Sequence, residues 1–274
     1  MANRTSRSSE KESGWLWESA KTIVYALLIA GVIRTVFFQP FWIPSGSMKP
    51  TLLVGDFLFV NKMAYGYSWA SCPNLGSFNL CWFARDLDGR ILGDEPEPGD
   101  IIVFKHPVDG RDFIKRLIGV PGDKVKMSDG RLIINDVELH LEPNGVFKEL
   151  RAPQGPVGNL PRCKGVSGID GSVCEKDLYE ETLPNGVRHA VLDIGHSYSD
   201  NTPVYHVPDN HYLFVGDNRD NSQDGRFPQN VGGVGFVPFE NLIGRADRVI
   251  FSSAGSWILA FWSWRSDRYF KRLE

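Results

Sequence analysis

The sequence lacks the patterns that would mark a metalloprotein, a nucleic-acid-binding protein or a repeat protein. Only four cysteines and six histidines occur in 274 residues, and none has C-x-x-C or H-E-x-x-H spacing, so no metal site is expected. The net charge of −3 gives no broad basic surface, which argues against a nucleic-acid partner. No segment recurs at a fixed period, which excludes a solenoid. We therefore expect a globular chain without metal or organic cofactor, whose histidines are structural or surface residues.

The four cysteines fall into two pairs that are close in sequence. Cys72 lies near Cys81, and Cys163 lies near Cys174. Two disulfides formed in an oxidising compartment are favoured over four free buried thiols.

One long apolar run is present near the N-terminus. It extends from Thr22 to Phe38 and is broken only by Arg34. A membrane helix needs about 20 mostly apolar residues, so the run predicts a transmembrane helix over 22–38 if Arg34 extends to an interface. A buried core helix and a cleavable signal peptide are the alternatives, although no small-x-small cleavage site follows the run.

The charges on either side of this run indicate its orientation. Basic residues occur in 1–21, whereas 35–48 carry no charge. The positive-inside rule then places the tail, 1–21, in the cytoplasm and the body on the outer side of the membrane. Disulfides also persist on that side.

The rest of the chain has the pattern of a mostly β protein with antiparallel sheets. Short alternating or β-branched runs are separated by turn dipeptides such as Pro-Gly, Asp-Gly and Asn-Gly. Two segments rich in Gly, Pro, Asp and Cys, 66–98 and 143–175, are expected to be surface insertions. The candidate strands are 57–61, 100–105, 111–119, 124–127, 132–134, 211–215 and 242–251.

The segment Trp257–Trp264 contains three tryptophans but is too short to cross a bilayer. A position in the membrane interface and a last core element are both open for it.

A possible nucleophile follows the apolar run directly, in the sequence PSGSMKPTLLVGD. Ser45 and Ser47 flank Gly46, so a hydroxyl and a backbone N–H can face one side, as an attacking oxygen and an oxyanion donor would require. A lone serine in a turn is more often a turn residue, so the assignment requires a base.

A candidate base occurs in the apolar run DFIKRLIGVPGDKV. Free lysine has a pKa of about 10.4, so well under about 1% would be neutral at cellular pH. Burial of Lys115 among Phe113, Ile114 and Leu117 would lower that pKa. Taken alone, Lys115 is more often a lysine at a strand edge on the surface.

The third segment is GDNRDNSQDGR, Gly216 to Arg226. By itself it predicts a salt-bridged structural loop, and it lacks the spacing of an EF-hand. PSGSM, then IKR with GVPGD, then GDNRDNS, in this order after a membrane helix, resemble the bacterial type I signal peptidases. The resemblance covers about residues 38–61, 99–125 and 211–250.

The resemblance implies a serine endopeptidase with a Ser-Lys dyad that removes signal peptides after small residues of the Ala-x-Ala type. Ser47 would be the acylating nucleophile, Lys115 its general base, Ser45 an oxyanion-hole hydroxyl, and Ser222 the hydroxyl that orients the lysine amine. A supporting polar network is implied for Arg116, Asp217, Arg219, Asp224 and Arg226. Shallow apolar substrate pockets are implied for Phe41, Ile43, Met48, Leu52, Phe113 and Ile114.

Two departures from the family pattern occur next to the third motif. Gly225 stands where the family usually has serine, and the stretch after Arg226, FPQNVGGVGFVP, is longer and richer in glycine. Both leave the shape of this loop undetermined.

Three other functions compete with this one. A self-cleaving repressor-type Ser-Lys peptidase would carry a DNA-binding head, which this sequence lacks. A processing peptidase for conjugation pilins would share the chemistry and differ only in its substrates. A catalytically silent, membrane-anchored export partner would not need Ser47, Lys115 and Ser222 together.

The expected organisation is a β body of two merged lobes on one transmembrane helix. A catalytic lobe would comprise 39–128 and 206–250, an inserted lobe 129–205, and a C-terminal segment 251–274. The expected partners are signal peptides of secreted preproteins and the lipid bilayer, in a position close to the secretion translocon.

Overall fold

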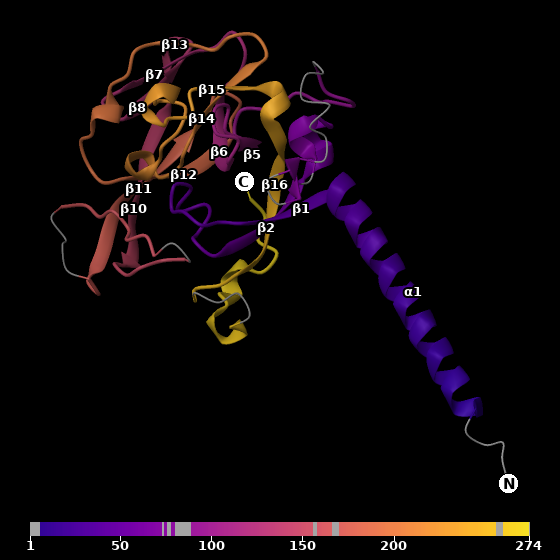
Figure 1. Cartoon of the computed structure of the whole chain (residues 1–274). Helices are drawn as coiled ribbons and strands as arrows, with labels where there is room; N and C mark the ends of the chain where they lie inside the picture. Colours follow the sequence, from indigo (N-terminus) through magenta and orange to yellow (C-terminus); the bar gives the residue numbers. More distant parts are fainter. Residues whose placement is uncertain are drawn as a thin grey trace.

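The computed structural model describes residues 6–72, 74–75, 78–79, 89–155, 158–165, 170–255 and 260–273. One α-helix, α1 (Ser6–Val36), precedes a body of strands and short 3-10 helices (Figure 1). All strand pairings among the described strands are antiparallel, so the prediction of a mostly β, antiparallel body is confirmed. The strands are β1 (Phe38–Trp42), β2 (Asp56–Asn61), β3 (Asn74–Leu75), β4 (Phe78–Asn79), β5 (Ile101–Lys105), β6 (Asp112–Gly119), β7 (Lys124–Ser128), β8 (Arg131–Ile134), β9 (Val137–Glu138), β10 (His140–Leu150), β11 (Val173–Thr182), β12 (Arg188–Asp193), β13 (Tyr205–His206), β14 (His211–Val215), β15 (Phe236–Pro238) and β16 (Leu242–Ser252).

The seven strands predicted from sequence are all present, within one residue at each end. Part of the predicted insertion 143–175 is instead regular: β10 extends to Leu150, and β11 begins at Val173. Most side chains of β10 are exposed on both faces, so its sequence has no apolar alternation that could have predicted a strand.

A seven-stranded sheet with the order β1-β2-β16-β5-β6-β14-β15 forms the main body. β16 pairs with β2 on one side and β5 on the other, and β6 lies between β5 and β14. Buried residues of these strands form two apolar clusters. The sheet therefore holds the segment with Ser47, which connects β1 and β2, and Lys115, which lies on β6.

Three smaller sheets complete the described part of the body: β13-β7-β8-β9, β10-β11-β12 and the two-stranded β3-β4. A disulfide joins Cys163 to Cys174 on β11. Cys72 is also disulfide-bonded, while Cys81 lies outside the described residues. The three-stranded sheet meets the third motif at β12, because Leu192 N donates to Asp217 O at 2.8 Å.

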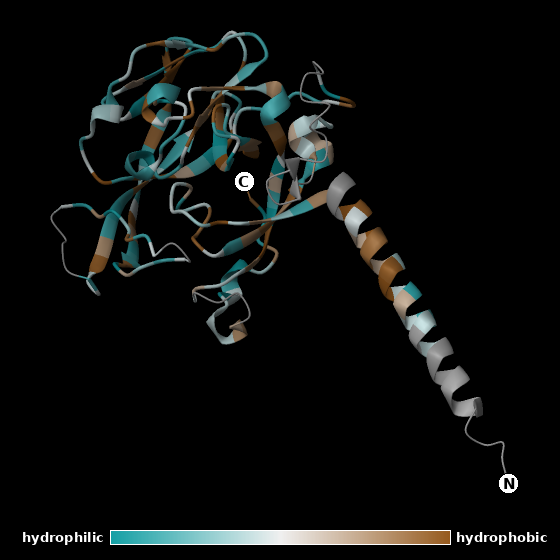
Figure 2. Cartoon of the chain, viewed as in Figure 1, coloured by the Kyte–Doolittle hydropathy of each residue, from teal (hydrophilic) through white to brown (hydrophobic). Residues whose placement is uncertain are grey.

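Helix α1 is longer than the predicted span 22–38. It begins at Ser6 and ends at Val36, and Phe38 already pairs with Asn61 in the sheet. The helix projects away from the body, with an apolar band on the half nearer to it (Figures 1 and 2). No helix within the described ranges combines the length and the apolar composition needed to cross a membrane. The side chain of Arg34 lies outside the described part of the structure.

The tryptophans near the C-terminus have different environments. The ring of Trp264 stacks on that of Phe251 with centroids 4.4 Å apart, and both side chains are partly buried. Phe261 and Trp262 are 70% and 76% exposed. Trp257 lies outside the described residues.

Candidate active site

The connection between β1 and β2 places Ser47 against β6 of the main sheet. Ile43 N donates to Asp56 O at 2.9 Å, and Gly55 N donates to Ile43 O at 3.0 Å, which closes the connection into a loop. The side chains of Met48 and Leu52 are fully buried in the core below. These two buried side chains anchor the loop and so hold Ser47 in a defined position. The serine itself is 7% exposed.

The central contact of the site joins Ser47 to Lys115. Lys115 Nζ is hydrogen-bonded to Ser47 Oγ, and the lysine is 4% exposed. Its strand, β6, is central in the sheet, with Ile102 of β5 opposite Lys115. The ring of Phe113 lies 5.8 Å from the amine. A buried hydroxyl and a buried amine are thus brought together from positions 68 residues apart.

Burial lowers the pKa of the Lys115 amine to about 8. The carboxylates of Asp224 and Asp217 act to raise this pKa, and the Arg226 guanidinium acts to lower it, but loss of hydration is the largest effect. A substantial fraction of the amine is therefore neutral near pH 8. In that form it can accept a proton from Ser47.

A buried carboxylate connects the segments that carry the base and the nucleophile. Asp217 accepts hydrogen bonds from Arg116 Nε and Nη2, both at 2.9 Å, and from Thr51 Oγ1 at 2.5 Å. Arg116 follows Lys115 on β6, and Thr51 lies four residues after Ser47. Burial acts to raise the pKa of Asp217, but Arg116 outweighs it and holds that pKa below its usual value.

Two residues of the third motif that sequence reasoning did not select also contact the nucleophile loop. Asn218 donates from its backbone N to Ser47 O at 3.0 Å and from Nδ2 to Gly46 O at 2.8 Å. A Cβ on Gly216 would lie 2.2 Å from Ser222 Oγ and 2.7 Å from Ser47 O. Both residues belong to the third motif, and no sequence signal separates them from their neighbours there. Only their contacts in the structure identify them.

The residues of the predicted polar network form ion pairs, two of which are joined because Arg226 Nη2 donates to Arg219 O at 2.6 Å. Asp224 pairs with Arg226, whose Nε and Nη2 donate at 2.9 and 3.0 Å, and it accepts from Gly216 N at 3.0 Å. Arg219 pairs instead with Glu181 of β11, at 3.1 and 2.5 Å. Glu181 is separated from Arg219 by 38 residues, and no local pattern indicates it.

Burial would raise the pKa of Glu181, but Arg219 and His189 outweigh it and lower the pKa to about 2. His189 Nε2 lies 3.2 Å from Glu181 Oε2. The pKa of His189 is lowered by burial and by the Arg116 guanidinium. The three-stranded sheet thus supplies a charged carboxylate to the third motif.

The structure gives less support to the two remaining serines. Ser222 Oγ is buried and has no hydrogen-bond partner among the described residues, so its role in orienting Lys115 remains a prediction. Ser45 lies in the same loop as Ser47, and its side chain is exposed. Its role as an oxyanion donor also remains a prediction.

The six residues predicted to form substrate pockets belong to two apolar clusters. Ile43, Met48 and Leu52 are fully buried, so they can shape a pocket only from below. Phe41 and Ile114 are partly buried and pack on the same cluster. Phe113 packs on the neighbouring one.

The glycine-rich stretch after Arg226 folds over the third motif. It contains a 3-10 helix, Gln229–Val231, before β15. A Cβ on Gly225 would lie 2.7 Å from Leu213 Cδ1, 2.8 Å from Phe214 O and 3.1 Å from Gly235 O. A side chain at 225 would therefore meet β14 first and Gly235 of the glycine-rich stretch next.

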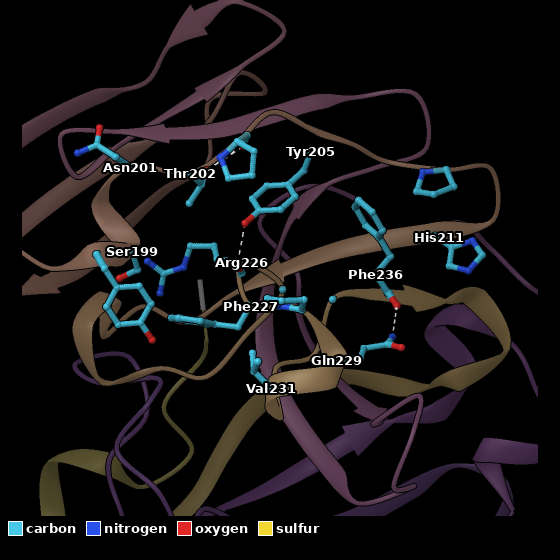
Figure 3. Close-up of a pocket in the computed structure, with 16 residues that line it drawn as sticks. Ser199, Asn201, Thr202, Tyr205, His211, Arg226, Phe227, Gln229, Val231 and Phe236 are labelled. Atoms are coloured by element: carbon cyan, nitrogen blue, oxygen red, sulfur yellow. Dashed lines mark hydrogen bonds between the residues drawn. The ribbon is translucent and has the colours of Figure 1, made fainter.

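A cavity of about 940 Å³ lies beside this stretch (Figure 3). Tyr205, Phe227 and Phe236 supply rings to its wall, and Tyr205 Oη donates to Arg226 O at 2.6 Å. Neither Ser47 nor Lys115 lines it. Within the described residues, no group of three or more His, Cys, Asp or Glu side chains is arranged to hold a metal ion.

The sequence matches the family described as "Signal peptidase, peptidase S26" over residues 16–251. A signal peptidase I of Rickettsia typhi (strain ATCC VR-144 / Wilmington) is 36% identical over 259 residues, covering 92% of this chain and 86% of that protein. A signal peptidase I of Rickettsia massiliae (strain Mtu5) is 36% identical over 265 residues, covering 94% and 86%. A crystal structure of a signal peptidase I from Enterococcus faecalis V583 covers 56% of this chain and 97% of its own, at 24% identity and a TM-score of 0.28, which is too low to support a comparison.

These matches confirm the resemblance drawn from the three motifs. The family match includes Ser47, Lys115 and the whole of the third motif. This chain belongs to the signal peptidase family, peptidase S26.

Proposed function

We propose that this chain cleaves signal peptides from exported preproteins, with Ser47 as nucleophile and Lys115 as general base. The observation that carries the proposal is the buried hydrogen bond between Lys115 Nζ and Ser47 Oγ, together with an amine pKa of about 8. Membership of the signal peptidase family supports the choice of substrate. The conjugation-pilin and silent-partner alternatives have no observation that favours them.

In the proposed reaction, Ser47 Oγ attacks the carbonyl carbon before the cleaved bond while neutral Lys115 takes the hydroxyl proton. The negative charge that develops on the carbonyl oxygen is stabilised by the Ser45 hydroxyl and the Ser47 backbone N–H. The lysine ammonium then gives its proton to the departing amine, which releases the mature protein. Water, deprotonated by Lys115, attacks the acyl ester, releases the signal peptide as a carboxylate and restores Ser47.

The apolar surface around Phe41, Phe113 and Ile114 would accept the small side chains before the cut. These three residues are only partly buried, and the fully buried Met48 and Ile43 would close the pocket from beneath. A shallow pocket excludes large side chains sterically, which gives a preference of the Ala-x-Ala type.

The proposed activity is tested with a purified precursor protein that carries a signal peptide. The wild-type chain should release the mature product, and Ser47→Ala and Lys115→Ala should each abolish release. The double variant should be no worse than either single one, because the two residues act as a unit. Robust cleavage by Ser47→Ala would refute the mechanism.

We also propose that α1 attaches the chain to a bilayer. Side chains such as Ile23, Leu27 and Ile29 are apolar and mostly exposed, and a helix that is apolar all round requires an apolar environment. The apolar part from Thr22 to Ile33 spans only about 18 Å, compared with about 30 Å for a hydrocarbon core. Full crossing therefore needs the helix as far as Val36, with Arg34 reaching an interface.

Membrane attachment is tested by flotation of the full chain with phospholipid vesicles. The wild type should float, and Leu27→Glu should reduce the floating fraction. Val137→Glu, at an exposed apolar position on β9, serves as the control and should not. The Cys163–Cys174 disulfide supports a body on the periplasmic or outer side, because disulfides persist in oxidising compartments.

A further inference from the structure

Lys49, two residues after the nucleophile, is buried although it carries an amine. Its side chain is 4% exposed. The amine is hydrogen-bonded to a carboxylate oxygen of Glu149 and donates to Gln154 Oε1 at 2.6 Å. A buried ammonium is tolerated only when it is paired. The nucleophile loop is therefore joined by a buried ion pair to Glu149, which lies on β10 of the three-stranded sheet.

The methylene stem of Lys49 passes over Gly46, the residue between Ser45 and Ser47. A Cβ on Gly46 would lie 3.3 Å from Lys49 Cε and 3.4 Å from Lys49 Cδ. The backbone of the same loop is held by Asn218, through Gly46 O and Ser47 O. The third motif and the three-stranded sheet thus hold the nucleophile loop by independent contacts.

Glu149 is itself firmly fixed. Lys176 Nζ of β11 lies 2.8 Å from Glu149 Oε1, and Gln154 Nε2 donates at 2.8 Å to Glu149 Oε2, the oxygen that is paired with Lys49. Cys174, which forms the disulfide with Cys163, lies opposite Glu149 in the strand pair. Burial acts to raise the pKa of Glu149, but the neighbouring amines of Lys176 and Lys49 hold it below its usual value. The carboxylate is therefore charged at neutral pH.

We propose that Glu149, acting through Lys49, is a positioning residue for Ser47, and that the three-stranded sheet contributes to the active site in this way. The inference rests on the proposed function, because it concerns the placement of the same nucleophile. Displacement of a reacting atom by about 1 Å can cost about 10²-fold in rate. Loss of the contact should therefore lower kcat and leave substrate binding nearly unchanged.

Two variants test the contact without removing the fold. Lys49→Met keeps an unbranched stem over Gly46 and leaves the Glu149–Lys176 pair intact, but it releases the loop. Glu149→Asp keeps the negative charge for both lysines and withdraws the carboxylate by one methylene. For both, we expect kcat on a precursor peptide to fall roughly 10- to 100-fold with KM within about twofold. Lys49→Arg, which keeps a cation for Glu149, should recover most of the rate.

The exposed ion pair Lys148–Glu175, at 2.8 Å on the same two strands, provides matched controls. Lys148→Met and Glu175→Asp make the same chemical changes at residues that directly precede Glu149 and Lys176. Both control variants should retain wild-type kcat. Thermal unfolding is measured for every variant, and kcat is expressed per folded molecule. A role limited to stability would lower Tm and leave that kcat unchanged.

Wild-type kcat per folded molecule in both Lys49→Met and Glu149→Asp would overturn this inference. That outcome is distinct from failure of the proposed function, in which the wild-type chain itself would not cleave the precursor. The midpoint of the rate–pH profile should be the same in Lys49→Met as in the wild type. A shifted midpoint would mean that Lys49 acts on the ionisation of Lys115, and this would also overturn a purely positional role.

Discussion

Arg116 and Asp217 form a buried ion pair with two hydrogen bonds, and it lies directly beside the proposed base. Both bonds are 2.9 Å long, and neither side chain is more than 1% exposed. Arg116 follows Lys115 in β6, and Asp217 also accepts a hydrogen bond from Thr51 of the nucleophile loop. One carboxylate therefore sets the spacing between the segments of the two proposed catalytic residues.

Asp217→Asn should destabilise the protein by about 3–5 kcal/mol, because it leaves the Arg116 guanidinium buried without a counter-charge. Urea unfolding measures the change. Asp109→Asn removes an exposed pair with Arg111 and should cost less than about 1 kcal/mol. Equal effects of the two substitutions would contradict the importance of the buried pair.

The cleavage rate should rise with pH and level off above about pH 8. Lys115 must be neutral to accept a proton, and burial lowers its pKa to about 8; below that value the neutral fraction falls about tenfold per pH unit. Single-turnover kinetics between pH 6 and 9 measure this. Lys115→Arg should be inactive at every pH, because a guanidinium stays protonated. A flat profile, with chemistry rate-limiting, would rule out a lysine base.

Ser45→Ala should reduce kcat roughly 10²–10³-fold if its hydroxyl stabilises the oxyanion. Substrate binding should change little, because this interaction strengthens only as charge develops. Ser45→Thr keeps a hydroxyl and should retain much of the rate. A loss below tenfold in Ser45→Ala, with threonine the worse substitution, would indicate that Ser45 only shapes the turn.

Gly216→Ala should cause a large loss of activity, because its Cβ would lie 2.2 Å from Ser222 Oγ and 2.7 Å from Ser47 O. The backbone oxygen cannot move without moving the nucleophile. Gly31→Ala, where nothing lies within 4 Å of the new Cβ, is the control for the same substitution in open space. Precursor cleavage by the two variants is compared, and a fully active Gly216→Ala enzyme would disprove the close approach.

Gly225→Ser should destabilise this chain by about 1–3 kcal/mol, because it overpacks the space beside β14. The new Cβ would meet Leu213 Cδ1 and Phe214 O within 2.8 Å. Chemical denaturation measures the cost. A serine variant as stable as the wild type would mean that the Leu213 side chain and the backbone at Phe214 move aside freely.

Much of the sheet could be predicted because its strands alternate or are β-branched. The β10–β11 region could not, because β10 is exposed on both faces and its sequence resembles a surface loop. Helix α1 was predicted as an apolar span, but its true start at Ser6 lies in a polar sequence without an apolar signal.

The sequence by itself determined the chemical groups and their order: a serine beside a glycine, a lysine in an apolar run, and a polar motif rich in aspartate and arginine. It also determined the family, because three specific motifs occur together. The tertiary structure alone decided which groups meet. Hydrogen bonds and ion pairs act over about 3 Å, whereas Ser47 and Lys115 are separated by 68 residues, and Lys49 and Glu149 by 100. Only sheet pairing and burial bring such pairs into contact, and the same burial lowers the pKa of Lys115 to about 8.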